Sequence, residues 1–462
     1  MRYLLLLFFA FGISPAWCQH RETQPAATHI VIEEINISGN KKTRDAIILR
    51  ELNIVKGQVV RSDSIPIYRK SDSLRLATVG LFTHIHISVD TLISRNIIWN
   101  IHVKERWFII PEPTFQLADR NFNVWWNEQN RDIRRAIIGV TVRHKNFRGN
   151  LENLIATVQV GYTRKFGLEY LKPYIDKQQK HGFGIAFAIA ESQETFFTTD
   201  SNKFRFIKTK DQYILRHYEG SVAYTYRPAY ASRHTLRLGY KHLNIEDTVA
   251  KLNSEYYKNG SSNLKMIELS YRFEQNKTDN WNYPLRGTKI IGQLISRFGI
   301  EGMNHQSFAT LEVGKFFNPA GKWYISTIFR GRLSFPDEQP YALRTALGGK
   351  FDYVRGYEYY VIDGSHFGVL RINFKRELLN ITIGKVGFKY LPVIPIRIYP
   401  KLFADAGYVH NQFSGNSFLN NKPLYAAGVG IDIFTFYDIK IRLEYTINHL
   451  RQKDLFLHFH SE

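Results

Sequence analysis

Apolar and polar residues alternate in short runs along most of this chain, and this alternation constrains its fold more than any other feature. Residues 439–447 read Ile-Lys-Ile-Arg-Leu-Glu-Tyr-Thr-Ile, and 183–190, 267–274 and 323–330 show the same two-residue period. Successive side chains of a β-strand point to opposite faces, whereas a helical face needs a period of 3.6 residues. These runs therefore predict β-strands with an apolar face opposite a polar or small-residue one.

An apolar face opposite charge suits a closed barrel with lipid outside and water inside, because every backbone group then pairs between strands. Phe, Trp and Tyr make up 15% of the chain, which is typical of aromatic girdles at two membrane surfaces. At ~20 to 22 residues per strand and turn, residues 106–462 predict an outer-membrane barrel of about sixteen antiparallel strands. A soluble β-sandwich or propeller is the alternative, but it would need turn-rich repeats that the sequence lacks.

The amino terminus has the features of a secretory signal peptide. Arg2 precedes a short apolar run, and Ala16 and Cys18 place small residues at a cleavage site. We expect residues 1–18 to be the signal peptide and residues 19–27 to be a linker. Cleavage would remove the only cysteine, so we expect a mature chain without disulfides.

The formal charge of +21 would usually point to nucleic acid as a partner. The signal peptide takes the chain away from nucleic acid, and its Lys and Arg residues are scattered along the strands rather than clustered. We expect no nucleic-acid partner. A basic lumen and contact with anionic lipid head groups both remain open as explanations.

Residues 28–105 form a separate unit, because helical spacing appears only there. The predicted order is strand, helix, helix, strand, strand: 30–37, 43–52 with Thr43 as cap, a helix with Leu74, Ala77 and Leu81 on one face, 85–89, and 97–103. The unit resembles a POTRA domain, the periplasmic module of the BamA/TamA outer-membrane assembly superfamily. The matching residues are Ile35-x-Ile-x-Gly-Asn40, Thr43, Arg50-Glu51-Leu52, Gly57, Gly80-Leu-Phe82 and Val103-x-Glu105.

The segment 347–357 carries the ingredients of a loop that folds back onto the protein. Glycines allow unusual backbone angles, and an arginine can make a bidentate contact with a buried carboxylate. The glycines are Gly348, Gly349 and Gly356, and the motif Val354-Arg355-Gly356-Tyr357 resembles the tip of the long sixth loop of the same superfamily. By this resemblance, we expect the motif to fix the loop to the barrel interior, and we call it the lock.

Two further segments resemble the superfamily in the same order. Pro284 and Gly287 match its Pro-x-x-Gly turn before a strand, and Asp405 matches the strand acid that meets the sixth loop in the lumen. The family often has a second acid on the strand after that loop. Residues 371–377 offer no unambiguous equivalent, so the resemblance leaves a second partner of Arg355 undefined.

The sequence contains no motif that predicts an enzyme. Nucleophile elbows, phosphate-binding loops and dinucleotide fingerprints are missing. The pairs His84/His86 and His458/His460 have no cysteine or carboxylate cluster beside them, so we expect no metal site. We therefore expect a protein that is not an enzyme and has no cofactor.

The resemblance implies a bacterial outer-membrane protein, with its POTRA-like domain in the periplasm, that inserts or translocates other proteins. It would act through POTRA binding and lateral barrel opening, on a seam that we place between a first strand near 137–142 and a closing strand near 438–448. The implied partners are client outer-membrane or secreted proteins, membrane lipids, and periplasmic or lipoprotein subunits. The alternatives are a dedicated secretion pore for one partner protein and a passive or plugged channel.

Overall fold

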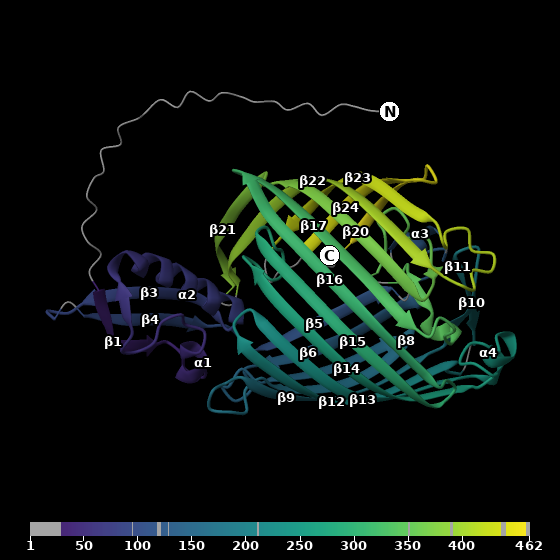
Figure 1. Ribbon diagram of the computed structural model, residues 1–462, viewed down its shortest axis with the longest axis horizontal. Helices are drawn as coiled ribbons and strands as arrows, with labels where there is room; N and C mark the ends of the chain where they lie inside the picture. Colours follow the sequence, from purple (N-terminus) through teal and green to yellow (C-terminus); the bar gives the residue numbers. More distant parts are fainter. Residues whose placement is uncertain are drawn as a thin grey trace, which may run out of the picture.

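The computed structural model describes residues 29–94, 96–117, 122–127, 129–209, 212–349, 352–388, 391–435 and 440–458. The predicted signal peptide and linker lie outside the described residues. A small α+β domain stands at one end of a large closed β-barrel (Figure 1). Among the described residues, no helix is long and apolar enough to cross a membrane.

The small domain packs its helices on a four-stranded sheet with the strand order β2-β1-β4-β3. Its core includes Ile32, Ile48, Leu76, Trp99 and Ile101, all at most 1% exposed. The elements are β1 His29–Ser38, α1 Asp45–Leu49, β2 Val59–Arg61, a 3-10 turn Ser62–Ser64, α2 Ile65–Val79, β3 Phe82–Thr91 and β4 Ile97–Glu105.

Two local predictions for this domain were wrong. Helix α1 is shorter than predicted and has Arg44 rather than Thr43 at its N-cap, because the Thr43 hydroxyl bonds to Glu105 instead. The predicted buried face of α2 counted Leu81 as helical, but Gly80 ends the helix in a left-handed conformation with φ 71°. Leu74 is consequently exposed, and Leu76 carries the buried face.

The described residues close a ring of strands, and neighbours in the ring are antiparallel wherever a register joins them. Segments β20 and β21 pair with successive parts of one long strand, β22, and so occupy one place in the wall. This gives sixteen places, which confirms the predicted barrel. The wall strands are β5 Ile109–Leu117, β6 Ala136–Lys145, β7 Asn153–Gly161, β8 Thr163–Lys172, β9 His181–Ser192, β12 Leu215–Ala229, β13 Ser232–Ile245, β14 Asn263–Thr278, β15 Gly287–Glu301, β16 His305–Ala320, β17 Trp323–Phe335, β20 His366–Arg376, β21 Leu379–Phe388, β22 Leu391–His410, β23 Pro423–Phe434, β24 Lys440–Asn448 and β25 Lys453–His458.

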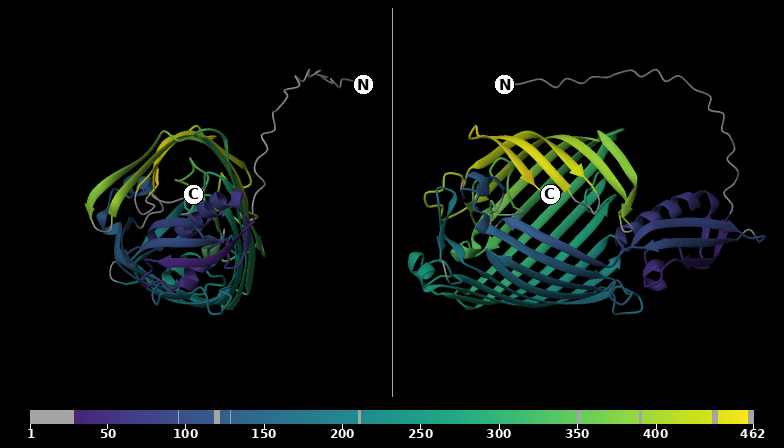
Figure 2. Two further views of the ribbon diagram at one scale, coloured as in Figure 1. Left: turned by 90° about the vertical axis from the view of Figure 1, so that its left-hand side faces the viewer. Right: turned by 180° about the vertical axis from the view of Figure 1, so that it is seen from behind.

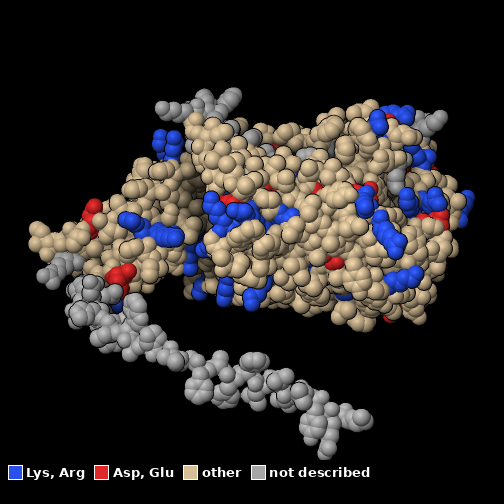
Figure 3. All heavy atoms as spheres, turned by 90° about the horizontal axis from the view of Figure 1, so that it is seen from above, with Lys and Arg blue, Asp and Glu red and all other residues tan. Residues whose placement is uncertain are grey.

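The outer surface of the wall is apolar. In β9 and β13 the outward side chains Phe183, Ile185, Leu236 and Leu238 are each more than 40% exposed. On the face drawn in Figure 3, Lys and Arg gather toward the two ends of the barrel, and the band between them carries few charged residues. Such a band is typical of a wall in contact with lipid.

The end of the barrel away from the small domain carries most of the connecting structure (Figure 1). These elements are α3 Phe122–Asn127, the hairpin β10 Glu194–Asp200 and β11 Lys203–Lys208, and α4 Asp247–Leu252. The long segment 336–365 contributes a 3-10 turn Tyr341–Leu343 and the short pair β18 Thr345–Leu347 and β19 Ile362–Asp363. We call this segment the inward loop.

The predicted seam strands were both wrong. The ring closes between β5 and β25, whereas residues 137–142 lie in the second wall strand and 440–448 in the last but one. Pro111 and Pro113 interrupt the strand pattern of β5, and proline is rare inside paired strands. The short strand β25 is hidden in the sequence because the charged stretch 451–454 precedes its apolar residues.

Candidate functional site

The inward loop enters the barrel, where its tip packs against the inner wall (Figure 2). Gly356 has φ 84°, and an added Cβ would lie 3.3 Å from Ala426 and from Thr446. Gly348 has φ 92°, and a Cβ there would lie 2.1 Å from the Tyr360 carbonyl oxygen. These two glycines let the loop turn tightly inside the lumen. Gly349 meets no such demand, since a Cβ there would have open space.

Arg355 lies at the tip of the inward loop and is completely buried. Its Nε donates to Asp405 Oδ2 at 2.9 Å, and its Nη2 donates to Asp405 Oδ1 at 2.5 Å. The guanidinium also lies 4.0 Å from the centre of the Phe403 ring. A bidentate contact of this kind fixes both the position and the orientation of the loop tip.

The second acid near Arg355 is Glu444, which sequence reasoning did not single out although it predicted the strand. Glu444 Oε1 in β24 lies 3.3 Å from Arg355 Nη1, and the same Nη1 donates to Asn373 Oδ1 in β20 at 2.7 Å. On the strand after the loop, Arg355 therefore meets an amide rather than an acid. The alternation of 439–447 was the available signal, because it places Glu444 on the polar, inward face of its strand.

Further charges extend this site into a network across the lumen. Lys401 Nζ lies 2.7 Å from both Glu444 and Asp432, and Arg442 Nε lies 3.5 Å from Asp432. All four side chains are at least 95% buried. Because each charge has an opposite charge close by, the network can stay ionised inside the barrel.

Val354 and Tyr357 flank the arginine and fill gaps in the wall. The Tyr357 hydroxyl contacts His449 and donates to the Tyr425 carbonyl at 3.0 Å. Val354 packs over Gly407, where an added Cβ would lie 2.5 Å from Val354. The loop tip is thus fitted to the surface formed by β22, β23 and the residues after β24.

The predicted Pro-x-x-Gly turn lies between β14 and β15 and reaches the same network. Gly287 has φ 107°, and a Cβ there would lie 2.1 Å from the Lys277 carbonyl oxygen. Asp279 holds the turn by accepting hydrogen bonds from the amides of Leu285 and Arg286, the two residues that follow Pro284. In the same turn, the Tyr283 hydroxyl donates to Asp432 at 2.8 Å.

The barrel seam between β5 and β25 differs from the rest of the wall. A register of paired residues joins every other neighbouring pair in the described wall, including nine residue pairs for β5–β6 and six for β24–β25. The ring order makes β5 and β25 hydrogen-bonded neighbours, and the described residues give no register for this pair. The seam is therefore characterised by the residues on its edges.

Two prolines limit the backbone bonds that β5 can make at the seam. Pro111 and Pro113 are two residues apart, so their backbone nitrogens point to the same edge of β5. The register with β6 runs unbroken across both residues, which places these nitrogens on the β25 side. Proline has no N–H to donate. The first half of β5 therefore offers β25 acceptors but few donors.

The short helix α3 spans the seam at the end away from the small domain. Asn123 Nδ2 donates to the Leu455 carbonyl of β25 at 2.8 Å and lies 3.1 Å from the Tyr359 hydroxyl of the inward loop. Asn127 Nδ2 donates to the same hydroxyl at 3.0 Å. One side chain, Asn123, thus joins the segment after β5 to the last strand.

The small domain is docked on the strand-connecting turns at one end of the barrel, across part of its opening (Figure 2). Arg227 of β12 donates to Glu51 at 2.8 Å and to the Tyr174 hydroxyl at 2.6 Å. Asn146 donates to Thr43 at 2.9 Å. Glu51 and Asn146 are each 1% exposed, so the two bodies share a buried polar junction.

Comparisons with known proteins agree with this architecture. Residues 146–448 match the Omp85 superfamily domain, and residues 30–106 match the POTRA domain, described as the surface antigen variable number repeat. A solved structure of BamA from Haemophilus ducreyi lacking POTRA domains 1-3 is 14% identical, with 93% of this chain and 83% of that chain covered and a TM-score of 0.54. CdiB from Escherichia coli is 12% identical, with 93% and 75% covered and a TM-score of 0.54. At these identities the likeness is one of fold. No curated protein matches.

Proposed function

Because this chain belongs to the Omp85 superfamily, we propose that it inserts or translocates client proteins at the bacterial outer membrane. Its POTRA domain lies in the periplasm in this proposal, and its barrel opens laterally between β5 and β25. The observation that supports the proposal is the pair of prolines, Pro111 and Pro113, which remove two backbone donors from the edge of β5 that faces β25. Strands separate most easily where the fewest backbone bonds must break.

Once open, the seam offers a client strand an unpaired edge. Strand β25 contains no proline in residues 453–458, so its edge keeps a complete set of donors and acceptors. Pairing of a new strand with such an edge is the β-augmentation used by many peptide-binding proteins. Main-chain bonds of this kind accept many client sequences, which suits a general assembly factor.

The POTRA domain offers a second edge of the same kind. The sheet order β2-β1-β4-β3 leaves the ten-residue strand β3 at one side, while the other side ends in the three-residue strand β2. We assign client binding in the periplasm to β3, because a longer edge gives more main-chain bonds.

The inward loop keeps the wall in shape beside the moving seam. Arg355 contacts β20, β22 and β24 through Asn373, Asp405 and Glu444. These contacts hold the strands next to the seam together while the seam itself is free to part. In this role the lock, through the contact of Arg355 with Asp405, holds together the part of the wall that does not open.

Cross-linking across the seam tests lateral opening. The only cysteine, Cys18, lies in the predicted signal peptide, so cysteines introduced at Phe115 in β5 and Leu455 in β25, both exposed on the outer face, have no background. Reagents of graded length should trap the seam closed and stop client assembly, and reduction of a cleavable reagent should restore it. Assembly at the wild-type rate in the locked barrel would contradict the proposal.

Depletion of the protein followed by outer-membrane proteomics tests the breadth of the function. Loss of many barrel proteins is the expected result. Loss of a single exported protein would instead indicate a dedicated secretion pore. An unchanged proteome would leave a passive or plugged channel as the remaining function.

A further inference from the structure

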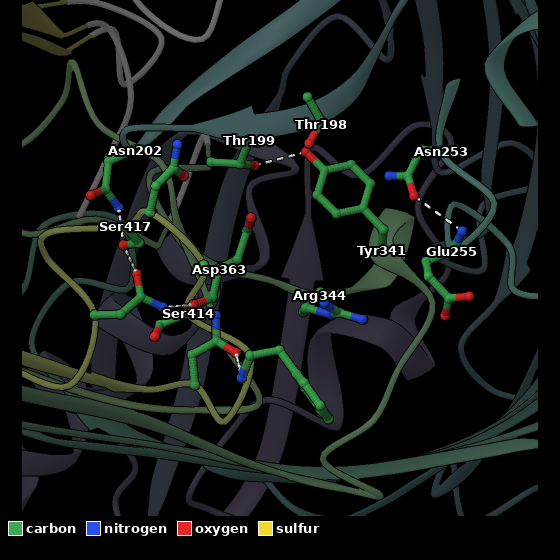
Figure 4. Close-up of a pocket in the computed structure, with 15 residues that line it drawn as sticks. Thr198, Thr199, Asn202, Asn253, Glu255, Tyr341, Arg344, Asp363, Ser414 and Ser417 are labelled. Carbon is green, nitrogen blue, oxygen red and sulfur yellow. Dashed lines mark hydrogen bonds between the residues drawn. The ribbon is translucent and has the colours of Figure 1, made fainter. Parts of the chain in front are cut away.

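The polar cavity at the end of the barrel away from the POTRA domain is held together by its own side chains (Figure 4). Thr199 and the Tyr341 hydroxyl are 2.7 Å apart, and Asn202 Nδ2 donates to Ser417 Oγ at 2.7 Å. These bonds tie the β10–β11 hairpin to the inward loop and to the connection 411–422. The cavity therefore joins these segments to one another.

A second hollow, of about 580 Å³, lies on the outer face of the wall and extends across β17, β20, β22, β23, β24 and β25. Lys401 and Gly430 can line it only through their backbones, because the Lys401 side chain is buried in the lumen network and glycine has none. The hollow therefore reaches down to the backbone of the wall, with larger side chains around it.

The apolar side chains of this hollow form one row across five strands. Neighbours in the row are register partners, so the row follows the hydrogen-bonding direction of the sheet. From β20 to β25 it covers four strand spacings, or ~19 Å. The members are between 36% and 56% exposed, and we call them the outer row: Phe374, Leu402, Val429, Tyr445 and Leu455.

The outer row climbs from the POTRA end of the wall toward the opposite end. Strand β20 begins directly after the inward loop, so it runs toward the POTRA domain, and Phe374 lies two residues before its last residue, Arg376. Leu455 lies two residues after Lys453, where β25 begins at the opposite end beside α3. A ligand that follows the row would therefore cross the wall obliquely.

A cation with free donors lies at the POTRA end of the row. Arg376 is exposed and has no hydrogen-bond or ion-pair partner among the described residues. Its guanidinium lies 5.0 Å from the centre of the Trp323 ring, which stacks on Phe374 with the ring centroids 4.8 Å apart. Stacking holds a guanidinium in place but leaves its N–H donors available, and two of them can bond to one phosphate in parallel.

We propose that this hollow holds one glycerophospholipid, with its phosphate on Arg376 and an acyl chain along the outer row. An apolar groove that ends at a single cation matches a ligand with a hydrocarbon chain and an anionic head. Half of the hydrocarbon core is ~15 Å thick, so a chain that crosses one leaflet obliquely has about the length of the row. With the POTRA domain in the periplasm, the lipid belongs to the periplasmic leaflet. Only this choice of leaflet rests on the proposed function.

Native mass spectrometry tests the site on the full chain in a non-ionic detergent. The probes are dioleoyl-phosphatidylglycerol, dioleoylglycerol, which lacks the phosphate, and inorganic phosphate. The phospholipid should bind at least about tenfold more tightly than dioleoylglycerol, because only the phosphate can make charge-assisted bonds to Arg376. Equal affinity for these two lipids, or equal affinity for inorganic phosphate and the phospholipid, would overturn the proposal. No client takes part in this measurement, so its failure would leave lateral opening untouched.

Variants then locate the lipid. Arg376→Gln should lower the affinity for the phospholipid to about that for dioleoylglycerol. Lys315→Gln, which removes an exposed charge of β16 outside the hollow, should bind like the wild type. Pro400→Phe fills the hollow and keeps Arg376, so it should weaken the binding of both lipids. Heat-modifiable mobility checks that each variant is folded. Equal phospholipid affinity in all variants would place the lipid elsewhere and overturn the proposal.

Discussion

Arg355 brings together strands that are far apart in the sequence, since Asn373, Asp405 and Glu444 all contact its guanidinium. A lysine could keep the charge but not the geometry, because a single ammonium cannot make the two parallel bonds to Asp405. The site therefore depends on the shape of the arginine as well as on its charge.

This dependence gives the first prediction. Arg355→Ala should destabilise the folded barrel by ~3 to 5 kcal/mol, because Asp405 would stay buried without its partner. Arg355→Lys should lie between this variant and the wild type. Heat-modifiable mobility of the barrel in gels reports the folded fraction, and Arg216→Ala, which alters a half-exposed arginine, is the matched control. Wild-type mobility of Arg355→Ala after heating would contradict the lock.

A second prediction concerns the junction between the POTRA domain and the barrel. Glu51→Ala leaves Arg227 buried without its acid, so the domain should detach or move more freely, at a cost of ~3 to 5 kcal/mol. Limited proteolysis between residues 105 and 109 should become faster. The double variant Glu51→Gln with Arg227→Met removes both charges and should recover much of the protection. Equal cleavage of the wild type and Glu51→Ala would show that the pair does not hold the junction.

The sequence predicted some residues of the lock and missed others. Arg355 and Asp405 stand in recognisable motifs, and the structure places them in contact. Glu444 was missed because its strand shows only ordinary alternation, and nothing local tells which lumen acid meets a distant loop. Thr43, Glu51 and Glu105 matched the POTRA pattern, but the partners of Thr43 and Glu51 across the junction could not be read from that pattern.

Among the elements, β5 governs how the barrel closes. Its two prolines remove donors from the edge that faces β25, and α3 compensates with a side-chain bond to the Leu455 carbonyl. Single substitutions at these residues can therefore change the contacts at the seam.

The third prediction strengthens the seam. Pro111→Val with Pro113→Val restores two backbone donors, so β5 and β25 should form a longer ladder. The barrel should resist thermal unfolding better and should assemble its clients more slowly. Pro319→Val, at the exposed end of β16 away from the seam, is the control for loss of proline itself. A variant with faster client assembly would contradict the role assigned to the prolines.

The fourth prediction loosens the seam. Asn123→Ala removes the bond to β25, whereas Asn127→Ala removes only a bond to Tyr359. Hydrogen exchange of the β25 amides should therefore rise in the first variant and change little in the second. Similar exchange in both variants would show that the contact to the inward loop, rather than the contact to β25, matters.

The elements were predicted best where one face is buried throughout. The POTRA strands and the central wall strands follow their two-residue period closely. The seam strands did not, because β5 contains two prolines and β25 begins in a charged stretch. For this reason the predicted seam fell one strand too far inward on both sides.

At the scale of the whole molecule, one POTRA domain is fixed to the mouth of one barrel. Our fifth prediction is that deletion of residues 28–105 leaves a folded barrel that no longer supports its clients. Because the deletion also leaves Arg227 without Glu51, it should be combined with Arg227→Gln, and Arg227→Gln alone is the control. Client levels measured by outer-membrane proteomics should fall only in the deletion strain. Normal client levels there would show that the domain is a passive anchor.

The prolines of β5 also bear on how copies of this protein meet one another in a crowded membrane. An open barrel exposes two bare strand edges, and two open copies could join edge to edge into a useless pair. Through its first half, β5 cannot supply the donors that such a pair needs. In the proposed mechanism, the two prolines thus also discourage self-association through β5, and β25 remains the edge that can pair with an incoming chain.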